Sequence, residues 1–304
     1  MDISKKFYQY APAAHLLVTD EDAADFLQSQ FTNELRPYEA GQCTYGLWLD
    51  VKGKVLADSV VLCEGSESFR VFSERCAGAA IAAHMERHII ADDVAIEQAA
   101  PGLVIEFGAP GAEALGLALP EQGRSIRFEG GTLFCARQGA YGLLSGSESE
   151  ANALLARLSS AGFTPLTVAE RGLARIAAGV VQVPEEIGAT DLPGEGGLER
   201  DAVSFTKGCY LGQEVVARMH NVGQPQRGLF LVDGEGAAPE VPLALYNCDS
   251  KQVGELRTAY PKSVGRWRGV AILKIRFAGA GQTLRFGDAE CVVGNRLREG
   301  RGND

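Results

Sequence analysis

The chain has few of the features that mark a membrane, secreted or metal-binding protein. It contains no run of 18 apolar residues, the length that predicts a membrane-spanning helix. Residues 1–14 lack the basic-then-apolar pattern of a signal peptide. Seven cysteines are present, and no two form a CxxC pair, so neither a zinc knuckle nor a local iron–sulfur motif is expected. These absences predict a cytoplasmic protein with free thiols, no metal site and no membrane partner.

An excess of basic residues is also lacking. The chain has 29 Lys and Arg against 39 Asp and Glu, a formal net charge of -10. Surfaces that bind nucleic acid are usually basic, so we expect no direct contact with nucleic acid. The chain does have 46% hydrophobic residues over 304 positions, enough for several packed cores.

The order of apolar patterns predicts an α+β fold. Strand hairpins alternate with helices up to about residue 178, and a related pattern occurs twice, which predicts two α/β sandwich subdomains. From Arg227 onward short apolar stretches alternate with Gly and Pro turns, which is typical of a small β-barrel. We therefore predict an α+β core in residues 1–223 and a C-terminal β-barrel in residues 224–304. The expected strands of the core are 15–18, 42–49, 54–63, 68–73, 93–98, 103–107, 125–128, 133–136 and 141–144, and its helices are 22–31, 74–90, 148–161 and 168–178.

A glycine-punctuated segment before the barrel carries a thiol. It reads Lys207-Gly208-Cys209-Tyr210-Leu211-Gly212-Gln213-Glu214. A Lys two residues from a Cys can stabilise a thiolate if the two side chains converge. Alternatively, Cys209 is a small buried hydrophobe and the glycines only turn the chain. Residue types alone favour the second interpretation.

This octapeptide resembles the signature K-G-C-[YF]-x-G-Q-E of the YgfZ family of folate-binding proteins, and it matches every fixed position. The resemblance extends from about His15 to Leu231, and the predicted barrel fits the architecture of the family. Other matching stretches, in chain order, are Phe26-Leu27-Gln28, Thr32-Asn33, Leu49-Asp50, Lys52-Gly53-Lys54, Asp58, Arg171-Gly172, Leu192-Pro193 and Glu195.

The resemblance implies tetrahydrofolate bound in a cavity among the domains. It also implies a role in making or maintaining iron–sulfur enzymes, including tRNA-modifying ones, so such enzymes or their assembly proteins are the expected partners. Cys209 would be the reactive or ligand thiol, and Lys207 would tune it. The residues assigned to folate or to fixing its loop are Glu195, Tyr210, Gln213, Glu214 and Arg218.

Two carboxylates link the chain to the related glycine-cleavage aminomethyltransferase. In that enzyme a carboxylate after a Pro holds the pterin, and Glu195 matches it. A carboxylate can accept two N–H bonds from the aminopyrimidinone edge of a pterin, whereas the alternative is a solvated loop acid. The enzyme also needs an acid on a hairpin strand, often within an Asp-Asp pair, where this chain has Ala57-Asp58.

The single acid at Asp58 weakens the case for aminomethyl transfer. The leading prediction is therefore a tetrahydrofolate-binding accessory protein, whose turnover of a substrate stays open. The alternative is a folate-dependent one-carbon transferase in which Asp58 is catalytic. A scaffold that binds a partner protein and no small molecule is a third class.

Several other polar residues have two interpretations. His84 and His88 are spaced for one helix face but lack the H-E-x-x-H order, so we expect surface histidines. Arg171 and Arg175 either contact the anionic tail of a folate or form ion pairs on a helix surface.

Overall fold

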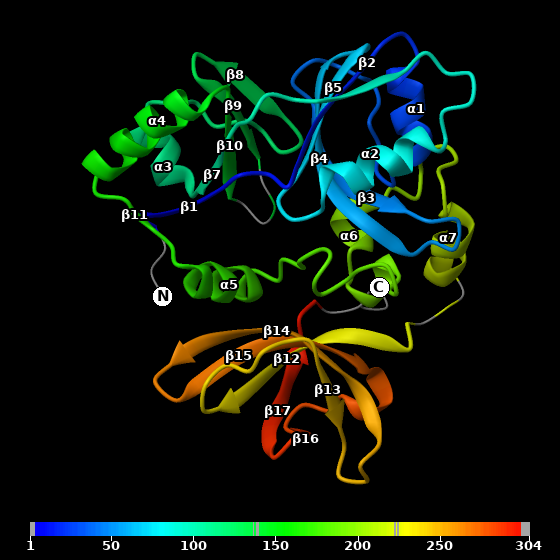
Figure 1. The fold of residues 1–304 in the computed structure, drawn as a ribbon, viewed down its shortest axis with the longest axis vertical. Helices are drawn as coiled ribbons and strands as arrows, with labels where there is room; N and C mark the ends of the chain where they lie inside the picture. The colour runs from blue at the N-terminus through cyan, green and yellow to red at the C-terminus, as the bar shows by residue number, and fades with distance from the viewer. Residues whose placement is uncertain (1–3, 136, 138–139, 222, 224, 299–304) are drawn as a thin grey trace. The chain divides into compact units, whose positions relative to one another are not determined.

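The computed structural model describes residues 4–135, 137, 140–221, 223 and 225–298 (Figure 1). Within them the chain forms two compact units, each discontinuous in the sequence. Unit 1 comprises Met1–Val51, Leu56–Thr167 and Asp201–Gln213. Unit 2 comprises Lys52–Val55, Val168–Arg200 and Glu214–Asp304.

Unit 1 contains two sheets, each covered by helices. The five-stranded sheet has the order β3-β4-β5-β2-β6, with α1 against β5 and α2 against β2 and β6. The six-stranded sheet has the order β11-β1-β7-β10-β9-β8, with α3 against β7 and α4 against β10. The elements are β1 (Lys6–Tyr10), β2 (Ala14–Thr19), α1 (Ala23–Gln30), β3 (Cys43–Leu49), β4 (Val55–Gly65), β5 (Ser68–Ser73), α2 (Gly78–Glu86), β6 (Ala95–Gln98), β7 (Val104–Phe107), α3 (Ala109–Ala114), β8 (Ser125–Phe128), β9 (Gly131–Cys135), β10 (Tyr141–Ser145), α4 (Glu148–Ser160) and β11 (Thr164–Pro165).

The two sheets of unit 1 share a buried apolar contact. Phe72 of the first sheet and Phe134 of the second lie with ring centroids 5.2 Å apart in an edge-to-face arrangement. Cys43 and Leu62 pack around them from the first sheet, and Leu144 from the second. Buried aromatic rings contribute strongly to core packing, so this contact helps to hold the two sheets of unit 1 together.

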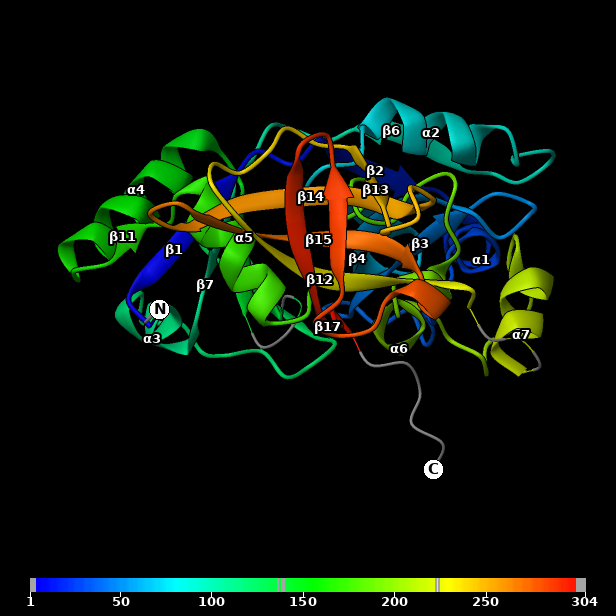
Figure 2. The ribbon, with the colours of Figure 1, turned by 90° about the horizontal axis from the view of Figure 1, so that it is seen from below.

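Unit 2 is built on a closed six-stranded barrel with the strand order β12-β15-β14-β13-β16-β17, drawn yellow to red in Figure 2. Trp267 is 1% exposed in its core. Helix α5 packs on β14 and β15, and Gly172 permits this approach, because a Cβ there would lie 2.5 Å from the ring of Tyr260. The elements are α5 (Val168–Ala177), η2 (Pro193–Glu195), α6 (Glu199–Ala202), α7 (Gln213–Asn221), β12 (Arg227–Glu235), β13 (Leu243–Tyr246), β14 (Gln252–Ser263), β15 (Arg266–Lys274), η3 (Ile275–Phe277), β16 (Thr283–Phe286) and β17 (Ala289–Arg296).

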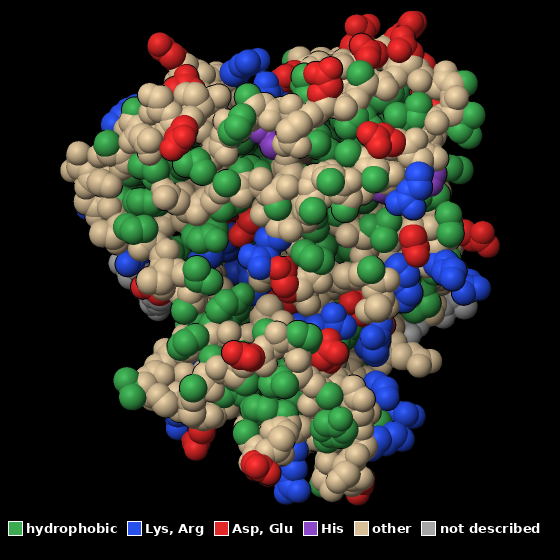
Figure 3. Space-filling model, viewed as in Figure 1, with side chains coloured by type: hydrophobic (Ala, Val, Ile, Leu, Met, Phe, Trp, Pro, Cys, Tyr) green, Lys and Arg blue, Asp and Glu red, His purple; other side chains and the backbone are tan. Residues whose placement is uncertain are grey.

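The predicted α+β fold and C-terminal barrel are confirmed, and the differences have local causes. The helix expected over 74–90 begins only at Gly78, because the amide of Cys76 bonds the hydroxyl of Ser73 and the amide of Gly78 bonds the carbonyl of Ala13. Strand β1 and helix α3 are additions. In the described part of the chain, no helix is long and apolar enough to cross a membrane. Figure 3 shows acidic, basic and apolar side chains interspersed on the drawn face.

Candidate functional site

The first six residues of the octapeptide form a loop between α6 and α7, which we call the thiol loop (residues 207–212), and its last two residues begin α7. Lys207 is 5% exposed and Tyr210 is 6% exposed, whereas Gly208 and Cys209 between them are exposed. Gly212 has φ +81°, a backbone conformation that favours glycine, and α7 follows directly. Cys209 is an exposed free thiol, so the interpretation of it as a small buried hydrophobe is wrong.

The ammonium of Lys207 points into the protein. Its Nζ donates to the carbonyl oxygens of Gln28 at 2.7 Å, Phe31 at 2.6 Å and Asn33 at 3.0 Å. These carbonyls belong to the end of α1 and the turn after it, where the helix leaves backbone acceptors unpaired. The ring centroid of Tyr210 lies 5.3 Å from the same Nζ.

Backbone bonds hold the segment around the thiol loop to the same turn of unit 1. The amide of Ser204 donates to the carbonyl of Thr32 at 3.0 Å, and the amide of Leu211 donates to the carbonyl of Ser29 at 3.1 Å. The hydroxyl of Thr32 donates to the carbonyl of Ala202 at 2.6 Å. The segment is therefore attached to the end of α1 before and after Cys209.

Asp58 lies on β4 among three side-chain donors. Tyr45 donates from its hydroxyl to Oδ2 at 3.0 Å, and Ser73 donates to Oδ1 at 2.9 Å. The thiol of Cys76 lies 3.5 Å from the same Oδ1. Burial raises the pKa of Asp58, and the opposing influence of Arg137 and of these donors is smaller. Asp58 is therefore a carboxyl group inside a polar cluster, not a solvated acid at a hairpin.

The Asp58 cluster is connected to the segment that leads into the thiol loop. The guanidinium of Arg137 lies 4.1 Å from the ring centroid of Tyr45, a cation–π contact. The same guanidinium contacts Asp201 through Nη2 at 3.3 Å. Asp201 begins the last segment of unit 1, which ends at Gln213. Two of the predicted site features, Asp58 and the thiol loop, thus belong to one unit.

Glu195 lies in unit 2, in a short 3-10 turn, and is 7% exposed. Arg227 binds it in a bidentate pair, with Nε 2.8 Å from Oε1 and Nη2 2.8 Å from Oε2. The amide of Leu192 also donates to Oε2 at 2.8 Å. Arg227 extends to Asp191 as well, at 3.1 Å, and Asp191 is fully buried. Glu195 is thus a buried carboxylate held in one orientation.

A small pocket lies beside Glu195 within unit 2. Residues 192–195 form one side, and Glu199, Val216, Met219 and Pro225 form the rest. Its cavity volume is about 10 Å³, roughly the space of one water molecule. In this structure the pocket therefore has no room for a pterin ring.

Comparison with known proteins identifies relatives of this chain. Residues 8–107 match the family described as GCVT N-terminal domain. The mitochondrial iron–sulfur cluster assembly factor IBA57 of Mus musculus is 30% identical over 241 residues, 73% of this chain and 64% of that protein. The tRNA-modifying protein YgfZ of Edwardsiella ictaluri is 29% identical over 241 residues, 75% of this chain and 70% of that protein. The chain thus spans less than two thirds of the mouse protein.

A solved structure agrees over a longer stretch. The glycine cleavage system aminomethyltransferase T from Bartonella henselae superposes with a TM-score of 0.79 over 98% of this chain and 88% of that one. Sequence identity is 15%, so this likeness concerns the fold. The chain is a YgfZ-family protein related to the glycine-cleavage T-protein.

The other predicted site residues of this YgfZ-family chain lie on α7. Gln213 begins the helix, and its amide donates to the carbonyl of Tyr210 at 3.2 Å. Glu214 is exposed in the first turn, and Arg218 is exposed in the last turn. The assignment of these residues to folate stays a prediction. His220, on the same helix, lies 3.9 Å from the carboxylate of Glu199 at the pocket.

Two of the open interpretations are decided by burial. His84 is 4% exposed and packs edge-on against Trp48, with ring centroids 6.2 Å apart, so the expectation of a surface histidine is wrong there. Burial lowers the pKa of His84 to about 4, and the neighbouring His88 adds to the effect. Arg175 is 6% exposed and forms a bidentate pair with Glu186, so it is occupied within unit 2.

Three residues at the site were not foreseen. They are Tyr45 and Arg137 beside Asp58, and Arg227 beside Glu195. Arg227 is the first residue of β12, and a basic residue at the predicted start of the barrel is a weak indication of a contact with Glu195. Nothing in the local sequence around Arg137 indicates its contact with Tyr45.

Proposed function

We propose that this YgfZ-family chain is a tetrahydrofolate-binding accessory protein that assists the assembly or maintenance of iron–sulfur enzymes, tRNA-modifying ones among them. The observation that carries the proposal is the intact octapeptide with Cys209 exposed between two buried anchors. The relatives named as an iron–sulfur cluster assembly factor and as tRNA-modifying proteins support it. The protein would act in the cytoplasm, on iron–sulfur enzymes or on the proteins that assemble them.

In this proposal, Cys209 is the residue that would contact the iron–sulfur enzyme or its assembly protein. Its thiol lies on the surface, whereas Cys43, Cys63, Cys76 and Cys291 are buried. Burial raises the pKa of each of these four buried thiols, which keeps them protonated and unreactive. An exposed thiol can act as a nucleophile or as a metal ligand without opening the fold. Cys209 therefore combines access with the family signature.

Glu195 would recognise the pterin from unit 2. A carboxylate offers about four lone-pair positions, and Arg227 and the amide of Leu192 occupy three of those on Glu195. Accepting two N–H groups of a pterin would therefore require Arg227 to release one oxygen, for which Asp191 offers an alternative partner. The adjoining pocket would have to widen to take a ring. Tyr210, Gln213, Glu214 and Arg218 stay proposed contacts of the rest of the folate or its loop.

Functional rescue tests the proposal. Cells lacking their own family member would receive wild type, Cys209→Ala or Cys248→Ala, and the activity of an iron–sulfur tRNA-modifying enzyme would be the readout. Cys248 is the matched control, because it is also an exposed cysteine but lies in the barrel unit. We expect rescue by wild type and by Cys248→Ala and none by Cys209→Ala. Failure of wild type, or full rescue by Cys209→Ala, would refute the proposal.

The second candidate is a folate-dependent one-carbon transferase. One observation favours it: Asp58 lies on the hairpin strand β4 in a buried polar cluster, and burial raises its pKa, which suits a general acid or base. This candidate predicts glycine-cleavage exchange activity with a lipoyl carrier protein. It further predicts loss of that activity in Asp58→Asn and its survival in Cys209→Ala. The accessory proposal predicts no exchange activity in any of the three proteins.

A further inference from the structure

Each N–H donor of the Lys207 ammonium has a carbonyl acceptor of its own. It has three N–H donors, and three carbonyl oxygens receive them at 2.6–3.0 Å. All three carbonyls come from residues 28–33, at the C-terminal end of α1, where the helix dipole also favours a cation. A neutral amine has only two N–H donors and would leave one carbonyl without its partner. Charge on Lys207 is therefore part of the fit.

The position of Lys207 makes this fit matter for Cys209. Ser204, Lys207 and Leu211 each bond the end of α1 or the turn after it, so they attach the chain at three successive points. Gly208 and Cys209 lie between the second and third points and are exposed, and a Cβ on Gly208 would meet nothing within 4 Å. The tip of the loop therefore has no packing of its own that could fix it.

We propose that Lys207 is a positioning residue whose ammonium, held by the carbonyls of Gln28, Phe31 and Asn33, fixes the exposed Gly208–Cys209 tip in one orientation. The ammonium acts on the thiol through the backbone of the loop, since its donors all point to these carbonyls. The role of the Cys209 thiol rests on the function proposed above. The attachment of the loop through Lys207 can be measured independently of that function.

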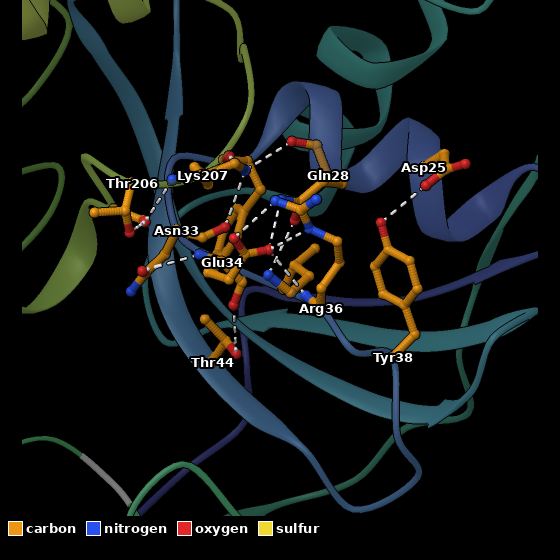
Figure 4. A network of polar contacts seen from close by, with 12 residues as sticks. Asp25, Gln28, Asn33, Glu34, Arg36, Tyr38, Thr44, Thr206 and Lys207 are labelled. Atoms are coloured by element: carbon orange, nitrogen blue, oxygen red, sulfur yellow. Dashed lines mark hydrogen bonds and ion pairs between the residues drawn. The ribbon is translucent and has the colours of Figure 1, made fainter.

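The charged groups near Lys207 add a pH dependence. Burial lowers the pKa of Lys207 to about 8, Glu34 favours the charged form, and Arg36 opposes it. Glu34 is itself paired with Arg36 at 2.9 Å, so its influence on Lys207 is reduced (Figure 4). The ring of Tyr210 contributes a weak attraction from the loop side. Because an exposed lysine keeps its proton up to about pH 10.5, raising the pH above about 8 favours the attached segment, in which Lys207 has lost its proton.

Hydrogen–deuterium exchange over peptides of residues 201–213 tests the proposal. We compare wild type, Lys207→Met and the control Lys274→Met, which removes a half-buried lysine that also bonds a carbonyl, that of Gln252. A hydrogen bond to a charged group contributes about 1.5–3 kcal/mol, so Lys207→Met should speed exchange at the amide of Leu211 by about 10- to 100-fold. The barrel strands should keep wild-type exchange in both variants.

The pH profile separates positioning from a general loss of stability. After correction for base catalysis, wild-type protection of residues 201–213 should rise as the pH rises from about 8 toward 10.5, because the open segment then binds a proton that the attached segment does not, and this step should be absent in Lys207→Arg. If Lys207→Met does not fold, the profiles of wild type and Lys207→Arg decide. Unchanged exchange in Lys207→Met, or a wild-type profile without the step, would overturn the proposal. Neither result depends on whether the protein rescues iron–sulfur enzymes.

Discussion

Replacing Arg175 with Met should destabilise unit 2 far more than the loss of an equally well-formed ion pair on its surface. The carboxylate of Glu186 is 0% exposed and accepts from Arg175 at 2.6 and 2.8 Å, from the amide of Gln182 at 2.9 Å and from Thr258 at 2.6 Å. Arg175→Met leaves this carboxylate buried with two donors and no positive charge. Breaking a buried pair from one side costs about 3–5 kcal/mol, and we expect a loss in that range.

The matched control is Arg268→Met. Arg268 forms a bidentate pair with Asp233 at 2.7 and 2.9 Å, but the two side chains are 31% and 40% exposed. Solvent screens such a pair, so the expected loss is about 0–1 kcal/mol. Urea unfolding followed by the fluorescence of Trp267, in a Trp48→Phe background, would measure both losses. Equal losses of stability in the two variants would show that burial does not set the cost of breaking these ion pairs. Adding Glu186→Leu to Arg175→Met should recover part of the loss, because no buried charge then remains unpaired.

Two further predictions concern titratable groups of the fold. In alkylation followed by mass spectrometry, Cys209 and Cys248 should react at least about tenfold faster than Cys76 and Cys291, whose pKa burial raises to about 12; equal rates would contradict the assigned burial. The pKa of His84 is about 4 in the folded protein and 6.5 in the unfolded chain. Between these two pH values the unfolded chain therefore binds a proton that the folded protein does not. The free energy of unfolding should therefore drop over that range, by up to about 3 kcal/mol, and less in His84→Leu; parallel pH curves would be evidence against a buried neutral His84.

Local patterns predicted most of the elements of this fold. The turn at Asp50–Gly53 with alternation on both sides predicted the β3–β4 hairpin, and the strands agree to within one or two residues. Strand β14 lies in the predicted barrel, but it carries Pro261 and several charged residues, a pattern that does not itself predict a strand. The helix expected from Glu74 was too long because residues 74–76 form bends, with the amide of Cys76 bonded locally to the hydroxyl of Ser73, and the amide of Gly78 bonds the carbonyl of Ala13.

The sequence predicted where the site lies along the chain but not which side chains contact each other there. The octapeptide located the thiol loop, but the partner of Lys207 lies 179 positions away at Gln28, and no local pattern encodes such a contact. The same holds for Arg227 with Glu195 and for Arg137 with Tyr45. Sequence reasoning expected Lys207 to tune the thiol of Cys209, and that stays a prediction. The contacts of its ammonium support a role in positioning the loop instead.

Calorimetric titration with tetrahydrofolate tests whether the protein binds folate and whether Glu195 holds it. The proteins are wild type, Glu195→Ala, Glu195→Gln and the control Glu290→Ala, which removes an exposed carboxylate paired with Arg285 on the barrel. We expect wild type and Glu290→Ala to bind equally, and both Glu195 variants to bind about 10- to 100-fold more weakly, since each loses a hydrogen bond to a charged group. No binding by wild type, or wild-type affinity in Glu195→Ala, would contradict the account.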